Sequence, residues 1–92
     1  MEKIFPNQFK AARALACLGQ AEVCKRAGIS LVTLRRLESQ QHYAEQVATQ
    51  TSDKVRSVLE AAGVVFLGPF EVAGVSWNYG VALRNPPDLS AH

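Results

Sequence analysis

The segment QAEVCKRAGISLVTLRRLE, residues 20–38, carries the strongest structural signal in this chain. Its first part predicts a short helix from Gln20 to Ala27, with Val23 on the apolar face. Gly28 follows at once and supplies the left-handed backbone conformation that a tight turn after a helix needs. The segment is therefore expected to begin with a helix and a turn.

The second part of the same segment predicts another helix immediately after the turn. Ser30 is a good N-cap, because its hydroxyl can accept a hydrogen bond from a backbone N–H two or three residues later. Leu34 and Leu37 continue the apolar face that starts at Ile29. Two short helices joined by a glycine turn form a helix-turn-helix, in which the second helix lies in the major groove of DNA.

The residue types fit this motif, although a packed helix pair with a charged surface is the alternative. Cys24 and Ala27 are small enough for the two helices to approach each other closely. Arg35 and Arg36 can bind guanine edges or phosphates, whereas an isolated arginine pair would ordinarily be a solvated surface. The glycine spacing, taken together with the arginines, favours DNA binding.

The segment resembles the Xre family of lambda-repressor-like, Cro-type helix-turn-helix regulators. The family pattern begins with Gln, has a small residue four positions later and Gly after another four, and continues with Ser, Thr, an aliphatic residue and Glu. Its counterparts here are Gln20, Cys24, Gly28, Ser30, Thr33, Leu34 and Glu38. The resemblance covers roughly residues 8–38. The later stretch TSDKVRSVLEAAGVVFL also looks like the last helix and strand of small members. Two residues depart from the pattern, since Gly19 replaces the usual Ser or Thr cap and Cys24 replaces the commoner Ala.

The resemblance implies a DNA-contacting surface and a role for each residue in it. Gln20, at the start of the bracing helix, would contact a phosphate. The face presented to DNA would consist of Ser30, Leu31, Val32, Thr33, Arg35 and Arg36. Physical chemistry is consistent with these roles, since Leu31 and Val32 can pack on thymine methyl groups. The alternative for Leu31 and Val32 is packing against a protein partner or in an extended core.

The charge distribution supports a polyanion-binding segment. Residues 10–36 hold six basic residues and only one acidic residue, Glu22, which is a net +5. The rest of the chain holds four basic and seven acidic residues, which is a net −3, so the whole chain carries +2. Positive charge concentrated on one segment is what a nucleic-acid-binding surface requires.

Helical patterns also lie on both sides of the motif. Before it, a helix is expected to open at Pro6 or Asn7 and to stop near Gly19, with an apolar stripe of Phe9, Ala12, Leu15 and Ala16. After it, residues 39–50 are polar and predict a loop with at most one helical turn. A clear amphipathic helix capped by Thr51 or Ser52 follows and closes at Gly63, with an apolar face of Val55, Val58, Leu59 and Ala62.

The chain then changes to β-type patterns. Residues 64–67 and residues 80–84 predict two strands, and Val75, Trp77 and Tyr79 alternate between them as in a strand. We therefore expect a mainly α fold, a lambda-repressor-like helix-turn-helix bundle of four to five helices with a small C-terminal β-hairpin or meander. The expected parts are a DNA-binding domain (6–63), a β element for dimerisation (64–84) and a disordered tail (85–92).

Other candidate sites are weak. Cys17 and Cys24 have no second pair at zinc-ligand spacing and are interpreted as small buried apolar residues. His42 and His92 have no nucleophile or metal ligand close in sequence. We expect no metal, no cofactor and no catalytic residue, and hence no enzyme. The lack of a long apolar run and of a signal peptide pattern predicts a cytoplasmic protein without membrane contact.

The aromatic group near the C-terminal end has two interpretations. Phe66, Phe70, Trp77 and Tyr79 are expected to form a hydrophobic cluster, part of which lies in a dimer interface. A ligand pocket lined by Trp77 and Tyr79 is the alternative.

These observations together predict a sequence-specific DNA-binding transcription regulator. We expect a homodimeric repressor that binds a palindromic operator through the major groove of double-stranded DNA. The alternative is an antitoxin-like module that binds a protein partner through the C-terminal β element and autoregulates its operon.

Overall fold

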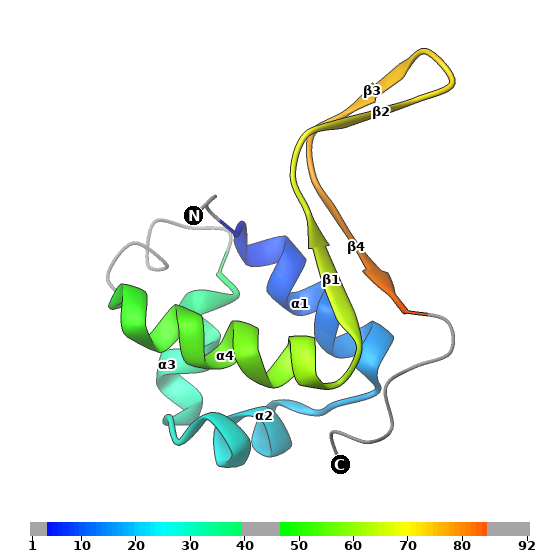
Figure 1. Ribbon diagram of the computed structural model, residues 1–92. Helices are drawn as coiled ribbons and strands as arrows, with labels where there is room; N and C mark the ends of the chain where they lie inside the picture. The colour runs from blue at the N-terminus through cyan, green and yellow to red at the C-terminus, as the bar shows by residue number, and fades with distance from the viewer. Residues whose placement is uncertain (1–3, 40–46, 85–92) are drawn as a thin grey trace.

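The structure, a computed structural model, describes residues 4–39 and 47–84. Four helices come first in the chain and four short strands follow (Figure 1). The helices are α1 (Pro6–Ala16), α2 (Gln20–Ala27), α3 (Leu31–Leu37) and α4 (Thr49–Ala61). The strands are β1 (Val64–Leu67), β2 (Phe70–Val72), β3 (Val75–Trp77) and β4 (Gly80–Leu83).

The expectation of a mainly α helical bundle with a small hairpin or meander is wrong. Of the described residues, 53% are helical and 19% lie in strands, which form two separate antiparallel two-stranded sheets. The molecule is therefore a small compact α+β domain. The physical reason is that β1 and β4 pack on the same core as the helices, since Val64 is buried in that core and Phe66 and Val81 pack against it.

The core lies where the inner faces of all four helices meet. The apolar periodicity of each helix places its large side chains inward, as the 3.6-residue helical repeat requires. The largest fully buried side chains are Phe9, Val23, Leu34, Val55 and Leu59. The prediction for α2 and α3 is therefore confirmed, but Leu15 of α1, expected on the apolar stripe, is 39% exposed.

The helix ends differ from the prediction in two places. The α1 helix ends before Cys17, which adopts a left-handed conformation (φ 56°) that glycine usually occupies. The α4 helix begins at Thr49, and Ala48 takes the N-cap position three or four residues before the expected Thr51 or Ser52. The predicted loop between α3 and α4 is only partly testable, because residues 40–46 lie outside the described residues, as does the predicted tail at 85–92.

A buried amide joins the β1–β4 sheet to α1. Gln8 is 4% exposed, and its side-chain Nε2 donates to the carbonyl oxygens of Leu67 at 3.1 Å and Gly80 at 3.0 Å. Its Oε1 accepts a hydrogen bond from the backbone N–H of Phe5 at 2.8 Å. Leu67 and Gly80 are the last pair of the β1–β4 ladder, so Gln8 fixes the point at which the two strands leave the helical body.

Beyond this point the chain forms the β2–β3 hairpin, which extends away from the helices (Figure 1). The two strands are joined by a two-residue turn in which Ala73 (φ 51°) and Gly74 (φ 80°) both have positive φ. Such turns match the twist of a β-hairpin, which explains the tight reversal of the chain. We call β2, β3 and their turn, residues 70–77, the arm.

Candidate functional site

The predicted turn between α2 and α3 is confirmed in its backbone geometry. Gly28 caps α2 in the left-handed conformation (φ 69°), and its N–H donates to the carbonyl oxygen of Cys24. The N–H of Ile29 also donates to Cys24 O, at 3.0 Å. A residue with a Cβ would be strained at this φ, so glycine determines the angle at which α3 leaves α2.

The predicted N-cap of α3 is also confirmed. The Ser30 Oγ accepts a hydrogen bond from the backbone N–H of Thr33 at 3.1 Å. The two hydroxyls lie 2.8 Å apart and share a further hydrogen bond. Because a hydroxyl both donates and accepts, Ser30 and Thr33 keep hydrogen-bonding capacity for a group outside the protein. Both lie at the first turn of α3, where backbone N–H groups favour an anion.

The remaining predicted residues of α3 divide into an inner and an outer side. Leu34, Leu37 and Glu38 are buried, so at 100° per residue Val32 and Arg36 point most nearly away from the core. Leu31 and Arg35 lie together on one flank, and Thr33 lies on the other. Val32 is 57% exposed and Leu31 is 38% exposed, so two aliphatic side chains lie on the outer surface of α3 beside the arginines.

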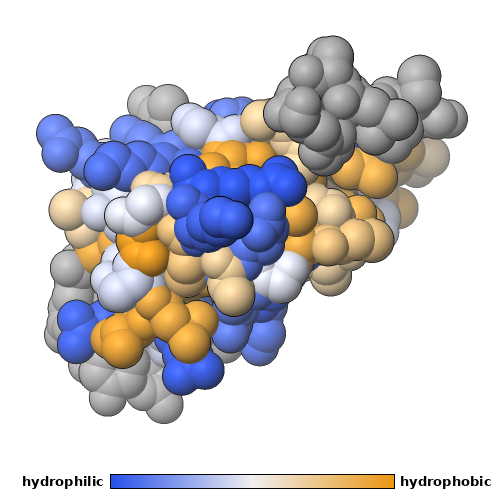
Figure 2. Space-filling model, turned by 90° about the horizontal axis from the view of Figure 1, so that it is seen from below, coloured by the Kyte–Doolittle hydropathy of each residue, from blue (hydrophilic) through white to orange (hydrophobic). Residues whose placement is uncertain are grey.

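The arginines of α3 carry charge that no described residue neutralises. Within residues 4–39 and 47–84, neither Arg35 nor Arg36 has an ion-pair partner, and both are exposed. Figure 2 shows the molecule from the side on which α2 lies in Figure 1, and hydrophilic and hydrophobic groups adjoin on that surface. Such a surface can bind both phosphates and apolar base edges.

One basic residue of the positive segment serves the fold instead. Arg13 of α1 donates two hydrogen bonds to the Glu38 carboxylate at the end of α3, from Nε to Oε2 at 2.5 Å and from Nη2 to Oε1 at 2.9 Å. Glu38 is 6% exposed, and its hydrogen bond raises the pKa of Arg13 above the usual arginine value. The pair therefore links α1 to α3, and Arg13 adds little to the external charge.

Gln20, predicted to contact a phosphate, lies at the first position of α2 and is partly exposed. Its Nε2 donates to Oε1 of Glu38 at 3.4 Å, the long limit of a hydrogen bond. The amide thus sits beside the Arg13–Glu38 pair, close to both α1 and the C-terminal end of α3. This weak contact leaves the second N–H of the amide available to another acceptor.

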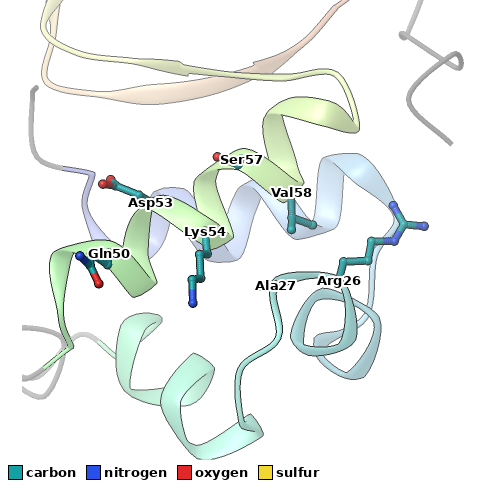
Figure 3. A pocket seen from close by; sticks show the side chains of 7 residues that line it. All are labelled: Arg26, Ala27, Gln50, Asp53, Lys54, Ser57 and Val58. Carbon is teal, nitrogen blue, oxygen red and sulfur yellow. The ribbon is translucent and has the colours of Figure 1, made fainter.

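A shallow groove of about 590 Å³ lies between α2 and α4 (Figure 3). Lys54 and Gln50 extend from α4 toward α2 and α3, whereas Asp53 points away from them (Figure 3). Arg26, on the α2 side, is held by an ion pair with Glu22 at 2.9 Å. The charged groups around this groove do not converge on one point, so its chemistry indicates no particular ligand.

The predicted aromatic cluster is divided among three places. Phe66 packs against Phe9 of α1, with ring centroids 5.8 Å apart. Tyr79 stacks on Phe5 at 4.5 Å. Phe70 and Trp77 form a separate pair on the arm, 6.1 Å apart and nearly parallel. The rings therefore do not make one cluster, and only the arm pair lies away from the helices.

Of the two cysteines, Cys24 is buried as predicted, but Cys17 is exposed, because the turn after α1 directs it outward. Both are free thiols. The described residues contain no group of three or more His, Cys, Asp or Glu side chains placed to hold a metal ion. His42 and His92 lie outside the described ranges. No helix in residues 4–39 and 47–84 has the length and apolar character needed to cross a membrane.

Sequence reasoning missed two structural residues near the site. Glu38 belongs to the family pattern, yet nothing in its spacing shows that its partner is Arg13, 25 residues earlier. Gln8 looks like an ordinary polar helix residue, and its burial is set by strands 59 and 72 residues away. The usable signal for Glu38 was an acidic residue at the end of a basic helix.

Comparison with known proteins gives no relative from which to transfer a function. No protein-family model matches the chain, and no curated protein matches its sequence. The resemblance to Xre-type regulators therefore stays a prediction that rests on the residues quoted above.

Proposed function

We propose that this protein is a sequence-specific DNA-binding regulator of transcription that inserts α3 into the major groove. The observation that carries the proposal is the outer surface of α3, where two arginines adjoin exposed aliphatic side chains on a helix held by a buried inner face. Neither arginine has an ion-pair partner among the described residues. Arginine reads guanine edges and phosphates, and aliphatic groups contact thymine methyl groups. Leu31 and Val32, exposed beside the arginines, supply the apolar part of such a contact.

We assign different roles to the two arginines of α3 from their positions on the helix. Arg36 and Val32 point most nearly away from the core and are one helical turn apart, so they face the base edges at the floor of the groove. Arg35 lies on the flank of the helix, where it faces the phosphate backbone at the groove wall. Ser30 and Thr33, at the N-terminal turn of α3, are suited to bind a phosphate on the opposite wall of the groove from Arg35.

The Arg13–Glu38 pair supports this role because it sets the orientation of α3 against α1. A recognition helix must keep its angle to reach base edges, since readout depends on hydrogen-bond geometry. Gln20 lies beside the pair at the start of α2, where a bracing helix meets the DNA backbone. We therefore assign Gln20 to a phosphate contact at the edge of the interface.

The simplest regulatory output is repression in the cytoplasm, in which the bound protein excludes polymerase from a promoter. A two-fold dimer would bind a palindrome whose half-sites are about 10 base pairs apart, one turn of the double helix. Contact with polymerase would make the same interface an activator, so the sign of regulation needs a promoter assay with the natural operator.

Equilibrium binding to a duplex recovered by selection tests the roles of the arginines. Arg36→Ala is expected to weaken binding to the selected duplex by about 1–3 kcal/mol and to change scrambled DNA far less. Arg35→Ala is expected to weaken both duplexes alike and to reduce the salt slope by about one. Arg56→Ala is the matched control, because it removes the same charge from α4, where Arg56 pairs with Glu60.

The control separates local contacts from net charge. If all three variants bind both duplexes alike and equally weakly, general electrostatics explains the binding. If Arg35→Ala and Arg36→Ala both bind as the parent does, α3 is not the DNA-contacting element.

A further inference from the structure

The arm has one apolar face and one polar face. Residues paired across a hairpin share a face, and alternate residues along each strand return to it. In the observed register, Glu71 pairs with Ser76, and both lie on the polar face. The opposite face, which we call the arm face, consists of Phe70, Val72, Val75 and Trp77.

The arm face is uncovered. Its four side chains are 36–57% exposed, although each would gain free energy by leaving water. Within the described part of the chain, the β2–β3 sheet pairs with no other strand and has two open edges. A lone two-stranded hairpin is marginally stable in water and gains from further packing.

We propose that the arm face binds the arm face of a second copy of this chain, related to the first by a two-fold axis. The inference names the dimer contact of the regulator proposed above and so rests on that proposal. Two-fold pairing covers the apolar face of both copies with a single contact, as isologous interfaces do.

The chemistry of the arm face favours its own copy as the occupant. All four side chains are uncharged, so a two-fold contact brings no like charges together, and Glu71 stays on the outer, solvated face. A partner with a charged surface would find no complementary group on this face. Phe70 and Trp77 stack on each other, so the arm face holds one fixed aromatic pair that can pack against an equivalent pair.

The area of the arm face fits a small dimer contact. From the exposed fractions and about 150–250 Å² per aromatic side chain, the face exposes on the order of 300–400 Å². A standard interface buries about 800 Å² per partner. The contact therefore predicts a weak dimer, which operator DNA strengthens by holding two copies side by side.

The arm is anchored and points away from the DNA-contacting surface. Gln8 holds both strands at the base of the arm, and Tyr79 stacks on Phe5 beside it. The arm extends away from the helical body, and α3 lies on the far side of that body from it (Figure 1). A second copy on the arm face thus leaves α3 of both copies open to DNA.

Trp77 is the only tryptophan in the chain and lies on the arm face, so its fluorescence reports the contact directly. Sedimentation and Trp77 emission would be measured over a concentration series with the parent chain. The matched variants are Val75→Lys and Ser76→Lys, which place the same side chain at adjacent positions on opposite faces. Circular dichroism would confirm that both variants keep the helical fold.

The parent is expected to form a dimer on concentration, with a blue shift of the Trp77 emission. Val75→Lys should raise the dimer dissociation constant by about tenfold or more, because it places an unpaired charge in an apolar contact. Ser76→Lys should change it by less than about threefold, since that side chain stays in water beside Glu71.

Two results would overturn the inference. One is a parent that stays monomeric up to the millimolar range, alone and on operator DNA, which would leave the arm face to another protein. The other is a dimer that Val75→Lys does not weaken. Binding of the parent to a half-site duplex is measured alongside, so loss of the dimer with half-site binding intact rejects the contact and keeps the DNA-binding proposal.

Discussion

The helical body and the arm follow the same amphipathic pattern, yet only the body satisfies it within one chain. Helices α1 to α4 turn their apolar faces toward one another, and side chains such as Leu34 and Leu59 are fully buried. The arm also has an apolar face, but Val75 and Trp77 remain about half exposed. The difference shows that the pattern predicts which face is apolar, whereas the contacts decide whether that face is covered.

Removing a large side chain from each region should give the largest contrast. Leu34→Ala is expected to lower the free energy of unfolding by about 2–5 kcal/mol, because it leaves a cavity in the core. Val75→Ala should lower it by less than about 0.5 kcal/mol in dilute solution. Urea unfolding followed by circular dichroism measures both. Equal losses would mean that the arm contributes to the same core.

The ion pair between α1 and α3 tests what holds α3 within the body. Arg13→Leu is expected to cost about 2–4 kcal/mol, since it leaves the Glu38 carboxylate buried without its partner. The double variant Arg13→Leu/Glu38→Leu should recover much of that loss, because no buried charge remains. Thermal unfolding of the two single variants and the double variant gives the coupling energy.

An absence of recovery in the double variant would show that Arg13 acts mainly by packing. In that case its hydrophobic stem, not its charge, would connect the two helices.

The junction between body and arm should respond to loss of the Gln8 amide. Gln8→Leu is expected to cost about 1–3 kcal/mol, because the carbonyl groups of Leu67 and Gly80 lose their donor. Amide hydrogen exchange should show faster exchange in β1 and β4 than in the parent. Lys10→Leu, an exposed change on the same helix, is the control and should leave the exchange of these strands unchanged.

The arm itself should be the easiest region to stabilise. Ala73 has a positive φ, which costs an ordinary residue about 1 kcal/mol, and Asn-Gly is the preferred pair for such a turn. Ala73→Asn is therefore expected to gain up to about 1 kcal/mol, visible as slower amide exchange in β2 and β3. Faster exchange would mean that the turn has a different geometry in solution.

Local signals in the sequence were sufficient to predict the helix, turn and helix of residues 20–37. The bounds of α2, the turn at Gly28 and the Ser30 cap depend on residues close together in the chain, and each was predicted correctly. The fold class was predicted wrongly, because it depends on the packing of β1 and β4 against α1. These strands lie far from α1 in the sequence. The pairing of Arg13 with Glu38 is likewise a long-range contact.

The arm shows the same limit. Alternation of Val75, Trp77 and Tyr79 correctly indicated a strand. The strand β3 covers Val75–Trp77, and Tyr79 lies just beyond it. Nothing in that alternation shows that β2 and β3 form a sheet separate from β1 and β4. The break lies at residues 68–69 and 78–79, which belong to neither ladder, and Gln8 binds the last β1–β4 pair just before it.

The most direct test of DNA binding through α3 is selection from a randomised duplex library. The purified parent and the Arg35→Ala/Arg36→Ala variant would be compared, with folding checked by circular dichroism. The parent is expected to enrich one recurrent sequence with two-fold symmetry, and the variant is expected to enrich none. No enrichment by the parent, or the same sequence from both proteins, would contradict DNA binding through α3.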